Sequence, residues 1–252
     1  MAKMTLLEMV QDILNDMDAD EVNSINDTVE SAQIAQILKT CYFEMLTNRN
    51  WPHMKNLVQL EASGSVTKPN YLKLPENLKE MEFLKYEAKK DVADKSDMKE
   101  LKYKHPDEFL VYLAHRNSLH TNIESVTDFS GVVLLIQNDQ APTYWTSFDD
   151  EYIVTDSYNK TLDTTLQSSK TQCLAYLYPT WTKQDDFVPD LPIEAFPAFL
   201  EEAKSTAFIT LKQMVNQKAE QKSSRQQRWL SRKAWRAHGG VRYQDFGRKG
   251  RR

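Results

Sequence analysis

The spacing of apolar residues changes twice along this chain, and these two changes limit what it can fold into. From residue 6 to about residue 48, and again from residue 196 to residue 215, apolar residues recur every three or four positions, as on one face of a helix. Between Trp51 and Pro179 they mostly alternate with polar residues, which is typical of strands that bury one side. The sequence therefore predicts an α+β fold: a helical body, an inserted and mostly antiparallel β region, and a long C-terminal helix ending in an extended basic arm.

The N-terminal segment, residues 1–52, predicts a pair of helices. The apolar stripe of the first helix consists of Leu6, Leu7, Val10, Ile13, Leu14 and Met17. Either Asp27 or Thr28 has the side chain of a helix N-cap, so we expect the second helix to begin there and to run to about Asn48. The Trp51-Pro52 pair closes it, because proline disfavours a helical backbone in the residue before it.

The next segment, residues 53–180, predicts the β region with one short helix. The expected strands cover residues 57–61, 71–74, 81–86, 132–136, 144–148, 152–155 and 173–178, separated by turn-forming residues. Pro106 and the acidic residues that follow it open a short helix through residue 113. The charged stretch of residues 88–104 is expected to be a mobile loop.

We expect residues 181–237 to form the long C-terminal helix and residues 238–252 to form the arm. The helix starts at about Pro189, and helix-forming residues continue to the end of its segment although the apolar stripe stops at Val215. Such a helix is on the order of 65 Å long at about 1.5 Å per residue. Its second half lacks an apolar stripe, so we expect it to project from the body. The Gly239-Gly240 pair then ends it.

Charge is distributed unevenly between the C-terminal segment and the rest of the chain. Residues 218–252 hold 12 Lys and Arg and 2 acidic residues, which leaves 20 basic and 34 acidic residues before them. The net charge of −4 therefore combines a basic tail with an acidic body. The tail is either a solubilising segment or a binding element for nucleic acid, an acidic protein surface or a second copy of the chain. Trp229, Trp235, Tyr243 and Phe246 favour binding, because a purely solvating segment has little use for large aromatic side chains.

The composition indicates a folded, soluble protein of a reducing compartment. A hydrophobic content of 40% in 252 residues is enough for a substantial core. Cys41 lies among Leu38, Tyr42 and Met45 at helical spacing, so a buried thiol is favoured over a disulfide with Cys173, the second of the two cysteines. No apolar run approaches the roughly 18 residues of a membrane-spanning helix, so we expect no membrane partner.

None of the common catalytic or cofactor-binding motifs occurs in the sequence. A G-x-S-x-G elbow, a P-loop, a G-x-G-x-x-G turn and an H-E-x-x-H pair are all absent. His115 and His120 are five residues apart, which does not place two metal ligands on one helical face. The pairs Asp149-Asp150 and Asp185-Asp186 leave a carboxylate metal site open as an alternative, but solvated turn acids are favoured. We therefore expect no enzymatic activity, no catalytic residue, no bound metal and no cofactor.

Non-specific nucleic-acid binding is the main alternative function for the tail. Arg225, Arg228 and Arg232 recur at three and four residues, which lines one face of a helix with positive charge. Further basic residues follow at Lys233, Arg236, Arg248, Lys249, Arg251 and Arg252. The acidic body opposes approach to a phosphate backbone, and the sequence has no recognition-helix or zinc-finger pattern. Any contact with DNA is therefore expected to be independent of base sequence.

Several sequence blocks together are similar to those of a known family. In the first part of the chain they are Met4-Thr5-Leu6-Leu7, residues 21–28 and Arg49-Asn50-Trp51-Pro52. Farther along they are residues 142–150, residues 166–172, Pro189-Asp190-Leu191-Pro192 and Glu202-Ala203-Lys204-Ser205. On these blocks and on the order of its elements, the chain resembles the head-to-tail adaptor, or connector, proteins of tailed bacteriophages, of the tail tubular protein A type.

This resemblance implies a structural protein of the virion. Adaptors of this kind form a ring, typically of twelve copies, beneath the portal at the capsid vertex, and they are present in the host cytoplasm during assembly. They dock on the portal protein through the C-terminal helix and arm, receive the tail tube or nozzle protein on the other side, and help to retain packaged DNA in the channel. The residues expected to bind the portal are Arg225, Arg228, Arg232, Trp235, Tyr243, Phe246, Arg248, Lys249, Arg251 and Arg252.

Overall fold

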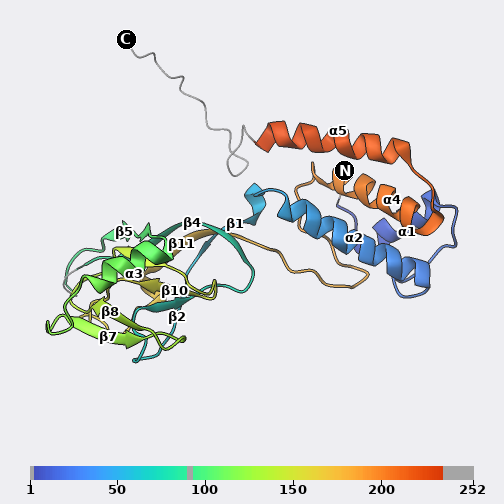
Figure 1. Ribbon diagram of the computed structural model, residues 1–252. Coiled ribbons are helices and arrows are strands. Elements are labelled where there is room, and N and C mark those ends of the chain that lie inside the picture. Colours follow the sequence, from blue (N-terminus) through green and yellow to red (C-terminus); the bar gives the residue numbers. More distant parts are fainter. Residues whose placement is uncertain (1–2, 90–92, 235–252) are drawn as a thin grey trace, which may run out of the picture. The chain divides into compact units, whose positions relative to one another are not determined.

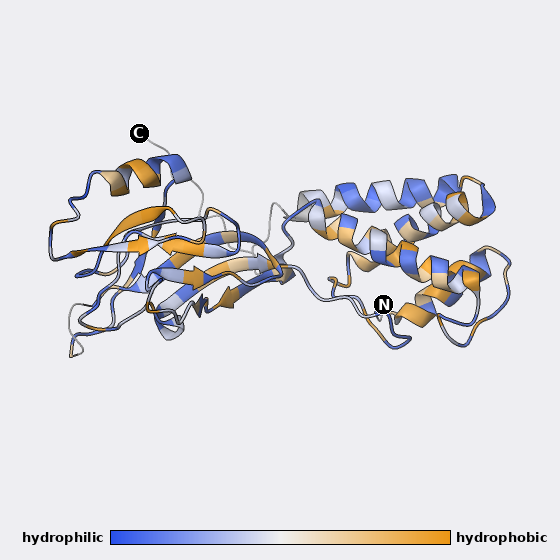
Figure 2. Cartoon of the chain, turned by 60° about the horizontal axis from the view of Figure 1, so that its bottom comes forward, coloured by the Kyte–Doolittle hydropathy of each residue, from blue (hydrophilic) through white to orange (hydrophobic). Residues whose placement is uncertain are grey.

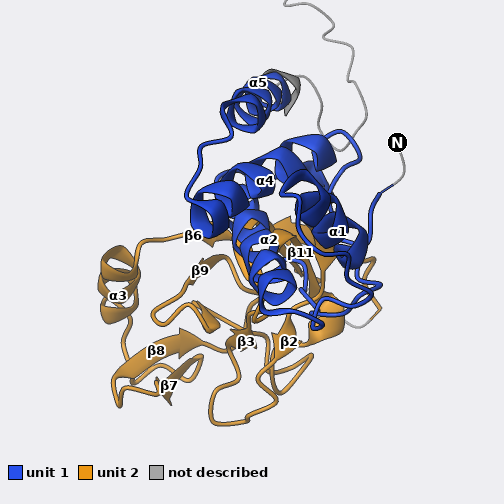
Figure 3. Ribbon diagram, turned by 90° about the vertical axis from the view of Figure 1, so that its right-hand side faces the viewer, with its two compact units in different colours: residues 1–55, 178–252 blue, residues 56–177 orange. Residues whose placement is uncertain are grey.

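The structure, a computed structural model, describes residues 3–89 and 93–234, with side chains through Ser231. It divides into two compact units: residues 1–55 with residues 178–252, and residues 56–177 (Figure 3). The first unit is helical and is built from both ends of the chain, whereas the second is mostly β and is inserted between them. The predicted α+β class, with an inserted and mostly antiparallel β region, is confirmed.

Four α-helices make up most of the described part of the helical unit (Figure 1). They are α1 (Leu6–Asp16), α2 (Val29–Thr47), α4 (Phe196–Lys212) and α5 (Gln217–Ala234), with a 3₁₀ turn at Pro52–Met54. α2 packs against α1 and α4, and α4 packs against α5. Leu6, Ile13, Leu38, Tyr42 and Phe199 are among the large side chains that this unit buries completely or almost completely. Because each such side chain contributes roughly 1.5–3 kcal/mol when buried, the helical unit has a hydrophobic core of its own.

Side-chain caps determine where α1 and α2 begin. The Thr5 hydroxyl accepts a hydrogen bond from the Glu8 amide at 3.2 Å, and the Glu8 carboxylate accepts one from the Thr5 amide at 2.8 Å. Thr28 and Ser31 form the same reciprocal pair at the start of α2, with both bonds at 3.1 Å. These bonds satisfy amides that have no partner in the first helical turn. Thr28 is therefore the cap of the second helix, one of the two residues that the sequence offered for this role.

The predicted C-terminal helix is confirmed only in part. α4 and α5 are helical, but the backbone reverses between them, and Gln213 has a left-handed conformation with φ 52°. α5 then packs along α4 (Figure 1). The prediction of one projecting helix is wrong, because helix propensity carries no information about contacts between the two halves of a helical segment. Residues 235–252, which include the predicted arm, lie outside the described residues.

The β unit contains three sheets in its described part. The first has the order β1 (Lys55–Val58), β11 (Thr171–Leu177), β4 (Leu78–Glu87) and β5 (Met98–Glu100). The second has the order β2 (Glu61–Ala62), β3 (Tyr71–Lys73), β10 (Tyr152–Thr155), β9 (Tyr144–Thr146) and β6 (Lys102–Tyr103). The third pairs β7 (Ile123–Thr127) with β8 (Val133–Gln137), and the unit also contains α3 (Pro106–Ala114) and a 3₁₀ turn at Ser168–Lys170. The pairs made by β3, β4, β8 and β10 are antiparallel, whereas β6 and β9 are parallel.

Part of the charged stretch that was predicted to be a loop, residues 88–104, consists of strands instead. β5 pairs with β4, with Lys99 opposite Tyr86, and β6 pairs with β9, with Tyr103 opposite Trp145. Both lie at the edge of their sheets. Backbone hydrogen bonds to one neighbouring strand hold them in place, so their sequences need no alternation of apolar and polar residues. Periodicity therefore did not identify them, and it also missed β7.

Cys41 and Cys173 are both buried and free, as predicted for Cys41. Burial raises the pKa of each thiol to about 11, because the thiolate loses its hydration in the core. Both side chains are therefore protonated and act as small apolar groups near neutral pH. Within the part of the chain that the structure describes, no helix is both long and apolar enough to cross a lipid bilayer.

Candidate interaction surface of the C-terminal helix

α5 is a hydrophilic helix whose start is defined by Asn216. Its residues are mostly Gln, Lys, Arg, Ser and Ala, and most of the helix has the colours of hydrophilic residues in Figure 2. The Asn216 side-chain oxygen accepts a hydrogen bond from the Ala219 amide at 3.1 Å, as an N-cap does. Glu220 lies in the first turn, where the helix dipole favours a negative charge. Local interactions therefore favour this helix even though few of its side chains are apolar.

One side of α5 packs on the helical unit largely through small residues. Ala219, Ser223 and Leu230 are at most 5% exposed, and their spacing of four and seven residues places them on one side of the helix. Ala219 and Ser223 have little side-chain volume, so the two helix backbones can approach closely. Leu230 adds a larger apolar side chain to this packed side. Apolar burial along α5 is modest compared with that of α1 or α2.

Polar contacts with α4 complete this packing. Lys222 Nζ lies 2.7 Å from Glu201 Oε1, and the Ser223 hydroxyl donates a hydrogen bond to Glu202 Oε2. Gln227 Nε2 donates to the same Glu202 oxygen at 3.4 Å. One carboxylate of α4 thus receives donors from two successive turns of α5. The attachment of α5 depends on hydrogen bonds of specific geometry as much as on apolar area.

Arg49, just beyond the end of α2, contacts the second half of α5. Its Nη2 donates a hydrogen bond to the Ser231 hydroxyl at 2.8 Å, and its guanidinium carbon lies 4.9 Å from the centre of the Trp51 ring. Partial burial lowers the pKa of Arg49, although the guanidinium stays charged. α5 is therefore held by α4 along its first half and by Arg49 near its other end.

The predicted basic residues lie on the opposite side of α5. Arg225 and Arg228 are exposed, and their positions are turned away from Ala219 and Ser223 around the helix axis. Trp229 follows on the same helix and is 52% exposed. The backbone of Arg232 belongs to α5, but its side chain lies outside the described part. The remaining predicted partner-binding residues, Trp235, Tyr243, Phe246, Arg248, Lys249, Arg251 and Arg252, also lie outside the described residues.

The sequence did not predict the packed side of α5. Ser223 and its partner Glu202 are 21 residues apart, and Ser231 and its partner Arg49 are 182 residues apart. Contacts between residues so far apart in the sequence leave no periodic pattern of residue types from which they could be predicted. A weaker signal was present, since Ala219 begins a stripe of small and apolar residues on a helix that is otherwise polar.

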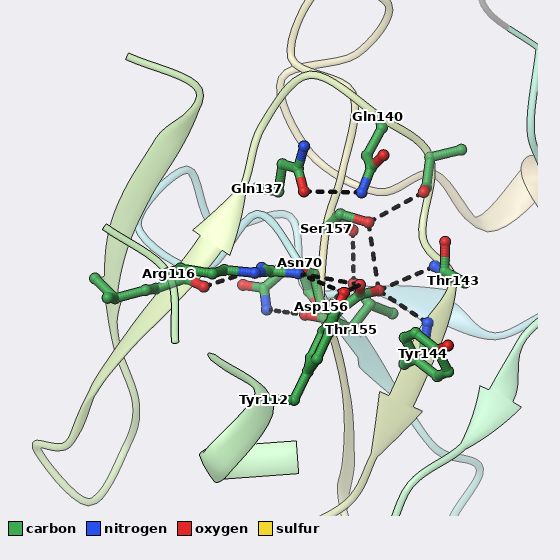
Figure 4. Close-up of polar contacts among 12 residues, drawn as sticks. Asn70, Tyr112, Arg116, Gln137, Gln140, Thr143, Tyr144, Thr155, Asp156 and Ser157 are labelled. Carbon is green, nitrogen blue, oxygen red and sulfur yellow. Dashed lines mark hydrogen bonds and ion pairs between the residues drawn. The ribbon is translucent and has the colours of Figure 1, made fainter. Parts of the chain in front are cut away.

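A second polar cluster lies inside the β unit, around Asp156 (Figure 4). The Asp156 carboxylate is fully buried, and its Oδ1 accepts hydrogen bonds from the amides of Thr143 and Tyr144, both at 2.9 Å. Its Oδ2 lies 3.2 Å from Arg116 Nη2 and 3.4 Å from the Tyr112 hydroxyl. Several donors therefore compensate for the lost hydration of this charge.

Arg116 is satisfied as fully as its partner. Its Nη1 donates to the main-chain oxygens of Asp156 at 2.5 Å and Leu135 at 3.0 Å, and its guanidinium carbon lies 4.9 Å from the centre of the Tyr112 ring. Both carboxylate oxygens and both terminal guanidinium nitrogens are thus used within the protein. The cluster joins the end of α3 to β8, β9 and β10, and its role is to hold these elements together.

One member of each acidic pair that left a metal site open accepts hydrogen bonds within the protein, Asp149 in a local turn and Asp185 from the segment before α2. Asp149 Oδ1 accepts hydrogen bonds from the amides of Glu151 at 3.0 Å and Tyr152 at 2.9 Å. Asp185 Oδ1 accepts one from the Ile25 amide at 2.9 Å. Among residues 3–89 and 93–234, no group of three or more His, Cys, Asp and Glu side chains is arranged to hold a metal ion.

Comparisons with known proteins add no family to these observations. Neither protein-family models nor curated proteins give a match for this chain.

Proposed function

We propose that this protein is a structural head-to-tail adaptor of a tailed-phage virion, which forms a ring beneath the portal and helps to retain packaged DNA. The division into two units supports this role. The helical unit and the inserted β unit each have a core of their own. A protein that bridges two partners needs two such separate surfaces. The sequence blocks that resemble phage adaptors occur in both units.

The outward side of α5 is the observation that carries the proposal. Arg225 and Arg228 lie on a helix whose other side is already occupied by α4. Their charges are therefore available to a partner, and they directly precede the basic residues 232–252. An acidic surface on a portal protein complements this charge. In the proposed complex, α5 and the residues after it dock on the portal.

The β unit offers a contact for the tail tube or nozzle protein. The turn between β7 and β8, together with the first residue of β8, exposes Phe129, Val132 and Val133, which are 58%, 52% and 57% exposed. Apolar side chains grouped on a short surface turn favour contact with another protein. We assign this turn to the tail side of the adaptor.

A portal pull-down tests the adaptor role. The full-length chain should be retained by its portal ring, whereas a chain ending at Gly240 and the double variant Arg225→Glu with Arg228→Glu should lose most of this retention. The matched control is Lys39→Glu with Lys95→Glu, which changes the net charge equally at two exposed lysines elsewhere. Equal retention of all four proteins would refute docking through the C-terminal segment.

Non-specific nucleic-acid binding is the second candidate. Arg225 and Arg228 share one side of α5 with the exposed Trp229, and basic and aromatic side chains together suit a phosphate backbone and its bases. Titration of a fluorescent DNA at several salt concentrations tests this function. Micromolar binding that weakens steeply with salt, combined with no portal retention, would favour it over the adaptor role.

A further inference from the structure

The reversal between α4 and α5 is made by four residues, and of their side chains only that of Asn216, the cap of α5, favours it. Residues 213–216 read Gln-Met-Val-Asn and contain neither glycine nor proline. Gln213 has φ 52° and ψ 29°, a left-handed conformation that is strained for a residue with a Cβ atom. Met214 and Val215 are 65% and 64% exposed, so their burial stabilises the turn little. Within the reversal, the amides of Gln213 and Met214 donate to the Phe208 carbonyl, and beyond it α5 is held by its contacts with α4.

One continuous helix is the alternative to this reversal. Both flanking segments are helical, and a helix accepts all four residues of the connection. A straight helix from residue 196 to residue 234 is about 58 Å long at about 1.5 Å per residue. α5 then extends past the end of α4 and no longer touches Glu201 and Glu202. Its packed side requires another surface.

That surface has to match α5 closely. It must supply carboxylates for Lys222 and Ser223, a donor for Ser231, and space for close backbone approach at Ala219. The helical unit of a second copy supplies all of these, because its α4 carries the carboxylates and its Arg49 is the donor. Every hydrogen bond and ion pair that breaks when the chain opens therefore forms again between copies, which is the basis of domain swapping.

We propose that α5 is exchanged between copies of this protein, with residues 213–216 as the hinge and with α5 of one copy packed on α4 of the next. Repeated in one direction, this exchange builds a head-to-tail ring, so the inference rests on the proposed adaptor function and adds the subunit contact to it. Arg225 and Arg228 lie on the opposite side of α5 and stay exposed in both states.

Two hinge variants shift this equilibrium in opposite directions. Asn216→Ala removes the cap of α5 and favours the continuous helix, by about fivefold for a typical cap. Gln213→Gly relieves the left-handed strain and disfavours the continuous helix, so it favours the closed chain. Light scattering of full-length chains at equal concentration should show more oligomer for Asn216→Ala, and less for Gln213→Gly, than for the unchanged protein. Circular dichroism verifies that both variants are folded.

Cross-linking identifies which copy supplies α5. One copy carries Glu201→Cys, and a second copy with a larger tag carries Lys222→Cys. A short bismaleimide added to the mixture should join the two different copies in the oligomer fraction. In the matched control, Lys95→Cys replaces Glu201→Cys and measures random linkage. Cys41 and Cys173 are buried and contribute little background.

Cross-linking between copies that is no stronger than in the Lys95→Cys control would refute the exchange. Light scattering that shows only monomer for every hinge variant, at the highest concentration reached, would also refute it. The portal pull-down distinguishes this failure from failure of the adaptor role. Cross-linked exchange without portal retention refutes the adaptor role alone. Portal retention without exchange refutes the swapped contact alone.

Discussion

Arg116 and Asp156 are paired twice, because the guanidinium of Arg116 contacts both the carboxylate and the main-chain oxygen of Asp156. The carboxylate is fully buried, and the Arg116 side chain is only 10% exposed. The pair therefore holds the end of α3 against the strand that contains residues 152–155 and its neighbours. Removal of either charge leaves the other buried without its partner.

Arg116→Ala is expected to destabilise the β unit by about 3 kcal/mol, because it leaves a buried carboxylate without its cation. Urea unfolding followed by tyrosine and tryptophan fluorescence measures this loss. Lys95→Ala, at an exposed position, is the matched control and should change stability little. An Arg116→Ala protein as stable as the control would show that the remaining donors alone support Asp156.

Lys204 connects α4 to α1, and we expect this connection to make the stability of the helical unit fall at alkaline pH. Its Nζ lies 2.7 Å from Asp12 and 2.6 Å from Asp16. Burial lowers the pKa of Lys204, but the two carboxylates outweigh this effect and raise it above its usual value. The ion pairs of Lys204 with the two aspartates therefore contribute fully to stability below the ordinary lysine pKa. This contribution is lost as pH rises through the higher pKa that Lys204 has in the folded protein.

Lys204→Met should lower stability at neutral pH by about 1 kcal/mol, since both aspartates are partly exposed. It should also reduce the fall in melting temperature above pH 10.5. Lys39→Met, at an exposed position of α2, is the control for loss of a charge. The same alkaline melting curve for Lys204→Met and the unchanged chain would contradict this prediction.

Asp128 predicts a loss of stability in acid. Its carboxylate accepts hydrogen bonds from the Tyr71 hydroxyl at 2.7 Å and from the Ser130 amide at 3.0 Å. Burial raises the pKa of Asp128, but these donors outweigh it and lower the pKa from 3.8 to about 2. The contribution is present above the unfolded pKa and is lost as pH falls from about 4 to about 2.

Asp128→Asn should therefore lower the melting temperature at pH 6 and flatten its dependence on pH in this acidic range. Thermal unfolding at several pH values between 2 and 6 tests the prediction. Asp20→Asn, at an exposed position, is the control. An unchanged slope for Asp128→Asn would show that other carboxylates determine the acid transition.

Thr28→Ala should destabilise the helical unit by about 1 kcal/mol, because the amide of Ser31 loses its acceptor at the start of α2. Thr40→Ala in the middle of the same helix is the matched control, since alanine favours a helix interior. Chemical unfolding of both variants measures the difference. Equal stabilities would mean that water replaces the cap without cost.

The sequence predicted the elements that periodicity specifies. Alternation identified β10 with its observed bounds, and the helical stripe identified α1 and α2. Periodicity did not identify β7, because only Ile123 and Val126 of its five residues are apolar. It also did not place the reversal at Gln213, because that reversal depends on contacts between α4 and α5.

Of the two sides of α5, the sequence predicted the exposed basic side but not the packed side. The spacing of Arg225 and Arg228 indicated one exposed basic side of a helix, and both residues are exposed on α5. The partners of the packed side, Glu202 and Arg49, were not predictable, because hydrogen bonds between distant residues leave no repeating pattern. The same reason applies to Asp156 and Arg116, which are 40 residues apart.

The insertion of the β unit has a consequence for biosynthesis. Residues 56–177 are continuous in sequence and can fold as soon as they leave the ribosome. The helical unit has its first two helices ready early, but Phe199 and Ala203, which belong to its core, are translated only after the whole insert. The nascent chain therefore exposes the apolar sides of α1 and α2 throughout synthesis of the insert. Exposed apolar helix sides of this kind are where an incomplete chain is most prone to aggregate.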